Sequence, residues 1–344
     1  MRASALHSPK LKILLTGASG FIGQQVLRYL LSQNHQVLCP TRNPHKLKSF
    51  HHKNCIIKHT DIYTQNLDFM QGYDTLIHLA WESMNNVCDY KHIDINYAHS
   101  MHLIKQAITS YKIKNITIAG SCFEYGTHSG KINESFIPNP QTSYGIAKTF
   151  LHKSLEQFQK IYPFQLKWLR IFYLYGEGQN PHSLLPQLQN ALNHKQTNFN
   201  MSGGEQLRDY LDIKIAASYI AKIALHQDFN GVCNICSGSP ISVRMLCERY
   251  LHNTQQSINL NLGFYPYAEY EPLAFWGDNT KLLEILSGGG GIERNKTLHN
   301  QKNPKTQPLK FSFIILDSRC HKHSTKCNQT LESKLDSPKS LEVA

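Results

Sequence analysis

The chain has 344 residues, of which 41% are hydrophobic and 17% are charged, an ordinary balance for a globular protein. No apolar run approaches the roughly 18 residues that a transmembrane helix needs, and the first residues lack the apolar stretch of a secretory signal. The formal net charge is +12, but there is no run of Lys and Arg and no nucleic-acid-binding motif. We therefore expect a cytoplasmic protein that binds neither membranes nor nucleic acid, and whose positive charge serves small anionic ligands.

Strands and helices alternate through the first half of the chain. Short apolar runs predict strands, and apolar residues that recur every three or four positions predict helices. The predicted strands are 12–16, 36–39, 55–58, 75–80, 116–120 and 167–172, and the predicted helices are 20–31, 94–111, 144–162, 184–193, 213–226 and 243–253. This order predicts an α/β protein with a doubly wound parallel sheet of the Rossmann type and a smaller C-terminal α/β substrate domain.

A glycine-rich turn lies between the first predicted strand and the first predicted helix. Gly17, Gly20 and Gly23 are spaced as G-x-x-G-x-x-G. In this setting the first glycine allows a tight turn, the second lets backbone N–H groups approach a pyrophosphate, and the third lets the helix pack close to the sheet. The helix N-terminus adds a dipole that favours phosphates. The turn predicts a dinucleotide site, to which we assign Gly17, Ser19, Gly20, Phe21, Ile22 and Gly23.

The residues after the second strand bear on the type of dinucleotide. NAD-binding proteins usually place an acid there for the ribose 2′-hydroxyl, whereas an arginine accommodates the 2′-phosphate of NADP. This sequence has Arg42 and no acid in 38–43, so NADP is slightly favoured over NAD unless Arg42 is only a solvated loop charge. Asp61, after the third strand, is a candidate acceptor for the adenine amino group or a helix cap. The predicted cofactor site also includes Ile62, Leu79 and Ala80.

A tyrosine and a lysine four residues apart are the candidate catalytic pair. Tyr144 and Lys148 open a predicted helix and therefore lie on one face of it. A nearby ammonium group, with the positive nicotinamide ring, is expected to lower the tyrosine pKa from its usual value near 10. Ser121 follows the fifth strand at the carboxyl edge of the sheet, where ligands bind, and can hydrogen-bond the reacting oxygen. These residues predict redox chemistry in which Tyr144 exchanges a proton with the substrate.

Several segments together resemble the extended short-chain dehydrogenase/reductase superfamily, in particular its NAD-dependent epimerase/dehydratase group, which acts on nucleotide sugars. The resemblance covers about residues 11–286 and rests on the segments TGASGFIG, HLA, SCFEYG, YGIAK, RIFYLYG, GQN and RDYLD. It implies that Ser121, Tyr144 and Lys148 match the catalytic triad of the family. It implies a nucleotide-diphosphate sugar as substrate and, by analogy alone, a homodimer.

The same resemblance implies roles for residues around the triad. Asn96 matches a helix asparagine that helps to order the triad, and we count it with the cofactor site. Arg208 matches a residue that often contacts the nucleotide diphosphate. The predicted substrate-binding residues are Trp81, Cys122, Phe123, Asn180 and Arg208. The 19 histidines form no cluster with metal-ligand spacing, so no metal site is predicted.

The two residues after Ser121 narrow the expected activity. Dehydratases of the group carry an acid pair where this chain has Cys122 and Phe123, which cannot eliminate water. The expected reaction is reduction of the 4-keto group of a nucleotide-linked deoxysugar, with an NAD-dependent 4-epimerase as the alternative. From another class, a non-catalytic dinucleotide-binding regulatory protein is the third hypothesis, although the intact triad speaks against it. No role is assigned to Glu124.

Three regions are predicted along the chain. Residues 1–172 form the dinucleotide-binding Rossmann domain, to which segments of about 208–236 return, and residues 173–286 form the substrate-binding region. The tail, 287–344, begins with Ser287 and four consecutive glycines, 288–291. It holds only scattered apolar residues, which predicts disorder. Because a glycine tract can be encoded by a slippery run of guanines, a second hypothesis is that the tail is read out of frame. Sequencing the tract in several isolates separates the two hypotheses.

Overall fold

The computed structural model describes residues 10–63 and 66–288, which belong to one compact unit. The predictions for the residues after the glycine tract lie outside the described residues. Within the described ranges, no helix combines the length and apolar character that a membrane span needs.

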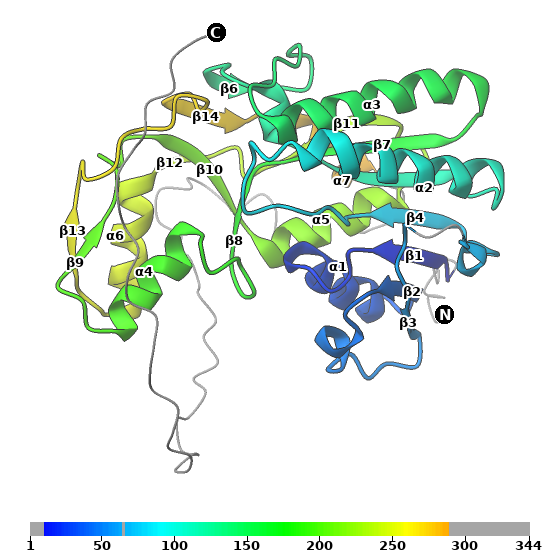
Figure 1. Cartoon of the computed structure of the whole chain (residues 1–344), viewed down its shortest axis with the longest axis horizontal. Coiled ribbons are helices and arrows are strands. Elements are labelled where there is room, and N and C mark those ends of the chain that lie inside the picture. The colour runs from blue at the N-terminus through cyan, green and yellow to red at the C-terminus, as the bar shows by residue number, and fades with distance from the viewer. Residues whose placement is uncertain (1–9, 64–65, 289–344) are drawn as a thin grey trace, which may run out of the picture. The chain divides into compact units, whose positions relative to one another are not determined.

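A seven-stranded parallel sheet forms the centre of the fold (Figure 1). Its strand order is β11-β7-β5-β4-β1-β2-β3, so β1 lies between β4 and β2. The strands are β1 (Lys12–Thr16), β2 (Gln36–Thr41), β3 (Cys55–His59), β4 (Thr75–His78), β5 (Asn115–Ser121), β7 (Gln165–Ile171) and β11 (Gly231–Ile235). The predicted Rossmann fold is confirmed, and the predicted strands differ from the observed ones by a few residues at their ends. The chain reverses direction across the sheet beside β1, the place where ligands bind in such folds.

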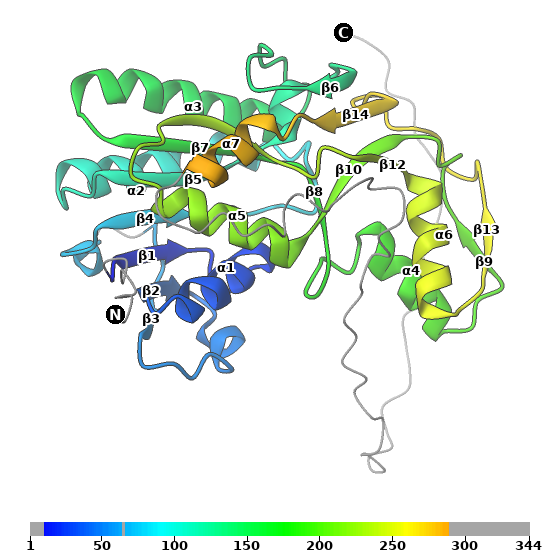
Figure 2. The same cartoon turned by 180° about the vertical axis from the view of Figure 1, so that it is seen from behind.

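Helices cover both faces of this sheet, as Figures 1 and 2 show. One face carries α1 (Phe21–Ser32), α5 (Ile213–Leu225) and α7 (Thr280–Gly288), which share a core containing Leu27, Ile220 and Leu282. The other face carries α2 (Ala98–Thr109) and α3 (Ser143–Ile161), which pack over Trp168. A π-helical segment, His92–Tyr97, leads into α2, and such segments occur frequently at functional sites.

Short strands beyond the carboxyl edge of the large sheet form a second sheet. Its order is β12-β10-β14-β6, with β8 paired to β10. Its strands are β6 (Gly130–Ile132), β8 (Tyr173–Tyr175), β10 (Leu207–Asp212), β12 (Pro240–Ser242) and β14 (Ala274–Gly277). Because β10 pairs within this sheet, the chain returns to the large sheet with α5 and β11, and again with α7. The division into a dinucleotide-binding domain and a substrate-binding region stays a prediction.

The remaining elements lie near this second sheet (Figure 1). They are α4 (Leu184–Asn193), α6 (Val243–Thr254) and a parallel pair of β9 (Asn198–Asn200) with β13 (Asn259–Asn261). Short 3-10 turns are Pro44–Leu47, Asp68–Met70 and η4 (Cys122–Tyr125), the last of which follows β5 directly. Cys122 and Tyr125 of η4 share a core cluster with Ile132 of β6 and Phe275 of β14, so the second sheet packs against the residues that follow Ser121.

Candidate functional site

The glycine-rich turn has the geometry of a dinucleotide cradle. Gly17 has a φ of +73°, and a side chain there would come within 2.6 Å of the backbone nitrogen of Ala80. A methyl group on Gly23 would overlap the carbonyl oxygen of Gly17. Helix α1 begins after Gly20 without a side-chain cap, so its first-turn N–H groups can accept a phosphate. These residues fit the pyrophosphate of a dinucleotide.

A cleft opens along this turn. Of the predicted cofactor residues, seven line it: Gly17, Ser19, Gly20, Arg42, Ile62, Leu79 and Ala80. Trp81 and Glu82 line it as well. Ile22 instead packs against the core under α1, and the Asp61 side chain accepts a 3.0 Å hydrogen bond from the backbone of Tyr63. The adenine contact of Asp61 stays a prediction.

Replacing Gly23 with alanine is expected to weaken dinucleotide binding at least about tenfold and to destabilise the fold by about 1–3 kcal/mol. The added methyl group has to displace the Gly17 carbonyl or the start of α1. Titration with NADH and thermal unfolding measure the two effects. Gly288→Ala is the matched control, because nothing lies within 4 Å of a side chain at that position. Wild-type affinity in the Gly23→Ala protein would contradict the assignment.

The predicted triad comes together at the carboxyl edge of the large sheet. Ser121 ends β5, and Tyr144 and Lys148 lie in the first turns of α3, whose N-cap is Thr142. All three side chains are buried, and Ser121 hydrogen-bonds Tyr144. The Lys148 ammonium donates to the carbonyl of Ala119 at 2.8 Å and lies 5.8 Å from the centre of the Tyr144 ring. The i, i+4 spacing and the strand order together produce this arrangement.

For the chain by itself, the pKa of Tyr144 is raised rather than lowered, and the lowering expected with the positive nicotinamide ring stays a prediction. Burial raises the pKa of Tyr144 well above its usual value and outweighs the hydrogen bond from Ser121, which lowers it. Burial also lowers the pKa of Lys148 to about 7, while the negative charge of Glu124 raises it. The cause is desolvation, which disfavours the charged form of both groups.

Glu124 holds the segment that carries Ser121 in place through hydrogen bonds of its buried carboxylate. It is fully buried, and one carboxylate oxygen accepts 2.8 Å hydrogen bonds from the backbone N–H of Ser121 and the indole N–H of Trp168. The other oxygen pairs with Arg170 at 2.9 Å. Ser121 and Glu124 form a capping box around η4. The spacing S-x-x-E was the available sequence signal for this role.

Aromatic rings surround the Tyr144 side chain. Trp81, His92 and Phe123 have ring centres 6.0, 5.2 and 6.0 Å from that of Tyr144. The Lys148 ammonium lies 3.5 Å from the centre of the Trp81 ring, a cation–π contact. The Trp81 indole N–H donates to His92 at 3.0 Å. Sequence reasoning missed His92 because nothing in its neighbourhood distinguishes it from the other histidines.

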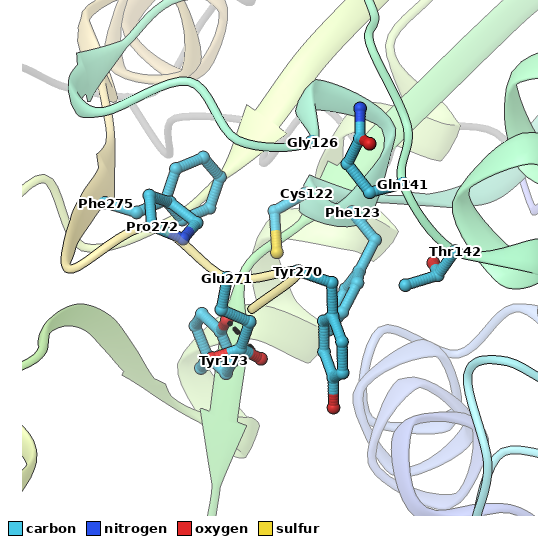
Figure 3. Close-up of a pocket in the computed structure, with 10 residues that line it drawn as sticks. All are labelled: Cys122, Phe123, Gly126, Gln141, Thr142, Tyr173, Tyr270, Glu271, Pro272 and Phe275. Atoms are coloured by element: carbon cyan, nitrogen blue, oxygen red, sulfur yellow. Dashed lines mark hydrogen bonds between the residues drawn. The ribbon is translucent and has the colours of Figure 1, made fainter. Parts of the chain in front are cut away.

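A second pocket is lined by residues that follow Ser121 in the chain and by residues of β8 and β14 (Figure 3). It is lined by Cys122, Phe123, Gly126, Gln141, Thr142, Tyr173, Tyr270, Glu271, Pro272 and Phe275. Glu271 accepts a 3.3 Å hydrogen bond from Tyr173 and pairs at 2.8 Å with Arg208. Two predicted substrate residues, Cys122 and Phe123, therefore line the same pocket as Glu271, the partner of Arg208.

The remaining predicted residues lie elsewhere. Asn180 donates a 2.5 Å hydrogen bond to Asn85 and is not among the residues that line either pocket. Asn96 is 1% exposed and contacts the backbone of Glu82 rather than the triad, with hydrogen bonds of 3.1 and 3.2 Å. Asn96 thus hydrogen-bonds the backbone of Glu82, a residue that lines the cleft along the glycine-rich turn.

The fold and cradle define a dinucleotide-binding Rossmann protein with a Ser-Tyr-Lys site at the sheet edge. The model of the NAD dependent epimerase/dehydratase family matches residues 13–236, and the chain belongs to this family. It is therefore an enzyme of the oxidoreductase or epimerase type, and the hypothesis of a non-catalytic regulator is wrong.

Two curated relatives and one solved structure illustrate the likeness. The dTDP-6-deoxy-L-talose 4-dehydrogenase (NAD(+)) of Aggregatibacter actinomycetemcomitans is 30% identical over 275 residues, covering 78% of this chain and 99% of the relative. An uncharacterized UDP-glucose epimerase of Bacillus subtilis, YtcB, is 26% identical, covering 80% and 92%. The UDP-glucuronic acid 4-epimerase of Bacillus cereus, solved with UDP-glucuronic acid and NAD, is 22% identical with a TM-score of 0.73, covering 82% and 95%. The structural likeness shows the fold.

Proposed function

We propose that this enzyme reduces the 4-keto group of a nucleotide-linked 6-deoxyhexose. The observation that carries the proposal is the meeting of Ser121, Tyr144 and Lys148 beside the dinucleotide cradle, with no acid at positions 122 and 123 to support dehydration. The 30% identical relative bears the name of a deoxysugar 4-dehydrogenase, which supports the same class of substrate.

In this proposal the phenol of Tyr144 donates its proton to the substrate oxygen. A dinucleotide held in the cradle would supply the hydride that the keto carbon receives. Ser121 lies within hydrogen-bonding reach of Tyr144 and holds the same substrate oxygen. Lys148, fixed by Ala119 and Trp81, stabilises the phenolate that remains on Tyr144. The surrounding rings exclude water from the proton transfer.

The sugar is proposed to lie between Trp81 and the wall formed by Cys122 and Phe123. Phe123 contacts the Tyr144 ring edge-on, so a substrate that touches Phe123 is also within reach of the phenol. Arg208 and Asn180 are proposed to serve the nucleotide end of the substrate. Arg208 keeps its buried pairing with Glu271 and therefore contributes through the shape and charge of the second pocket.

For the cofactor we propose NAD. The sequence slightly favours NADP because Arg42 could pair with a 2′-phosphate, but Arg42 forms a 2.5 Å ion pair with Glu82. The first-named relative carries NAD(+) in its name.

A homodimer in the cytoplasm is also proposed. The exposed Phe150 and Ile161 on α3 support an interface between helices of two copies, and size-exclusion chromatography tests the oligomeric state.

The decisive experiment is incubation of the purified enzyme with NADH or NADPH and a panel of 4-keto nucleotide sugars. Stoichiometric loss of reduced-cofactor absorbance with a dTDP-linked 4-keto-6-deoxyhexose supports the proposal. If no 4-keto sugar consumes cofactor, the proposed reaction is wrong.

A 4-epimerase is the second candidate, since the 26% identical relative is named as an epimerase and the same triad serves that reaction. An epimerase returns the hydride to its substrate and consumes no cofactor overall. Interconversion of UDP-glucose and UDP-galactose without added cofactor, followed by chromatography of the sugars, would favour this candidate over the reductase.

The rate of reduction is expected to fall as the pH rises through about 7, because burial lowers the pKa of Lys148 to about 7. Below this pH the lysine is an ammonium that stabilises the Tyr144 phenolate, and above it the lysine loses that charge. Tyr144 keeps its proton over the same range because burial raises its pKa. The measurement is kcat/KM against pH. A rate that stays constant well above neutral pH would contradict this expectation, and Lys148→Arg should move the fall to higher pH.

A further inference from the structure

An ion pair crosses the mouth of the cofactor cleft. Arg42 follows β2 and Glu82 follows β4, and these two strands lie on opposite sides of β1. The pair, with a separation of 2.5 Å, therefore spans the end of β1, where the glycine-rich turn begins. Both residues line the same cleft as Gly17 and Gly20.

The backbone of Glu82 is held in this position by two hydrogen bonds to Asn96. The buried Asn96 side chain accepts a hydrogen bond from the Glu82 N–H at 3.1 Å and donates one to the Glu82 carbonyl at 3.2 Å. Asn96 lies in the π-helical segment before α2. On the other side, the Thr41 hydroxyl donates to Ser19 at 3.2 Å and accepts from the Asn43 N–H at 3.0 Å. The Glu82 backbone and the two residues that flank Arg42 are thus hydrogen-bonded within the cleft region.

The charged groups around this ion pair do not favour the binding of an anion. Tyr63, which lines the same cleft, has its pKa raised to about 12 by burial and by the negative charges of Glu82 and Asp61, while Arg42 lowers it. Two carboxylates and one guanidinium therefore act on this part of the cleft. An added phosphate would meet a cation that is already paired and two like charges.

We propose that Glu82 determines the choice of dinucleotide, by pairing with Arg42 and so excluding a 2′-phosphate from the cleft. An acid at the end of the second strand usually holds the ribose 2′-hydroxyl of NAD, and an arginine there accepts the 2′-phosphate of NADP. This chain has the arginine, and the acid that pairs with it comes from the segment after β4. The inference rests on the dinucleotide site of the proposed function and names the residue that sets its selectivity.

The expected effect is a change in the ratio of two affinities. A 2′-phosphate carries up to about two negative charges at neutral pH, and Arg42 and Glu82 are 54% and 40% exposed, so solvent screens their interaction. Glu82→Gln removes the repulsion and releases Arg42. We expect NADPH to bind about tenfold more tightly to this variant than to the wild type, and NADH affinity to change by less than about threefold.

The test is titration of each variant with NADH and with NADPH, followed by fluorescence of the bound nicotinamide. Glu82→Gln should shift the NADPH-to-NADH ratio, and the double variant with Arg42→Gln should lose the shift, because the gain needs the freed arginine. Glu248→Gln is the matched control, since Glu248 pairs with Arg244 at 2.7 Å with similar exposure on α6, outside the residues that line the cleft. Its ratio should equal that of the wild type.

Two results would overturn different statements. An unchanged ratio in Glu82→Gln, with both nucleotides still binding, overturns the role of Glu82 alone. A shift that persists in the double variant also overturns it, because Arg42 then plays no part. If the wild-type protein binds neither nucleotide, the proposed function fails, and the role of Glu82 fails with it.

Discussion

Tyr144→Phe is expected to lower kcat by about 10²–10⁴-fold, the usual contribution of a positioned acid or base. The variant keeps the ring that packs among Trp81, His92 and Phe123 and loses only the hydroxyl that hydrogen-bonds Ser121. Binding of NADH should therefore stay within about threefold of the wild type. Steady-state kinetics with the active 4-keto sugar, together with NADH titration, measure both quantities.

The matched control is Tyr97→Phe. This variant also loses a hydrogen-bonded hydroxyl. The Tyr97 hydroxyl, in the π-helical segment, lies 2.9 Å from that of Ser154 on α3. The kcat of this variant should remain within about twofold of the wild type. If Tyr144→Phe kept most of the wild-type kcat, the phenol would not be the proton donor and the proposed mechanism would have to be abandoned.

Glu124→Ala is expected to lower the free energy of unfolding by about 3–5 kcal/mol, the usual cost of removing one partner from a buried ion pair. The substitution leaves the buried guanidinium of Arg170 without its carboxylate. It also removes the acceptor for the Ser121 backbone and the Trp168 indole. Urea unfolding at neutral pH measures the loss.

Two further variants separate the ion pair from a general loss of packing. Glu156→Ala removes a partly exposed carboxylate on α3 that pairs with Lys153 at 2.8 Å and lies 3.4 Å from His152, and should cost less than about 1 kcal/mol. Glu124→Gln combined with Arg170→Met removes both buried charges and should recover part of the loss seen in Glu124→Ala. Equal losses of unfolding free energy for Glu124→Ala and Glu156→Ala would show that the buried ion pair stabilises the fold no more than the Glu156 interactions do.

Local signals predicted much of the large sheet and its cradle. The run 12–16 became β1 without change, and the glycine spacing after it placed Gly17 and Gly23 where a side chain cannot fit. The helix that begins near Tyr144 followed from its apolar periodicity, and the spacing of Tyr144 and Lys148 put both on one face of α3. These features depend on residues close together in the chain.

Other features had no local signal. The strands of the second sheet have three to six residues each, too short for a clear alternating pattern. His92 became part of the site because its ring meets Trp81 and Tyr144, which come from separate elements. The role of Glu124 had a capping signal in the sequence, but its partner Arg170 lies on β7, 46 residues away.

By itself, the sequence determined the Rossmann class and the glycine spacing of the cradle turn, and it predicted Ser121, Tyr144 and Lys148 as the triad, because each depends on short-range spacing and on backbone sterics. Only the tertiary structure decided the electrostatics of the site. Burial, which no single segment controls, raised the pKa of Tyr144 and lowered that of Lys148. The strand order placed Glu82 next to Arg42, because parallel strands bring their carboxyl ends to one edge whatever their separation in the chain.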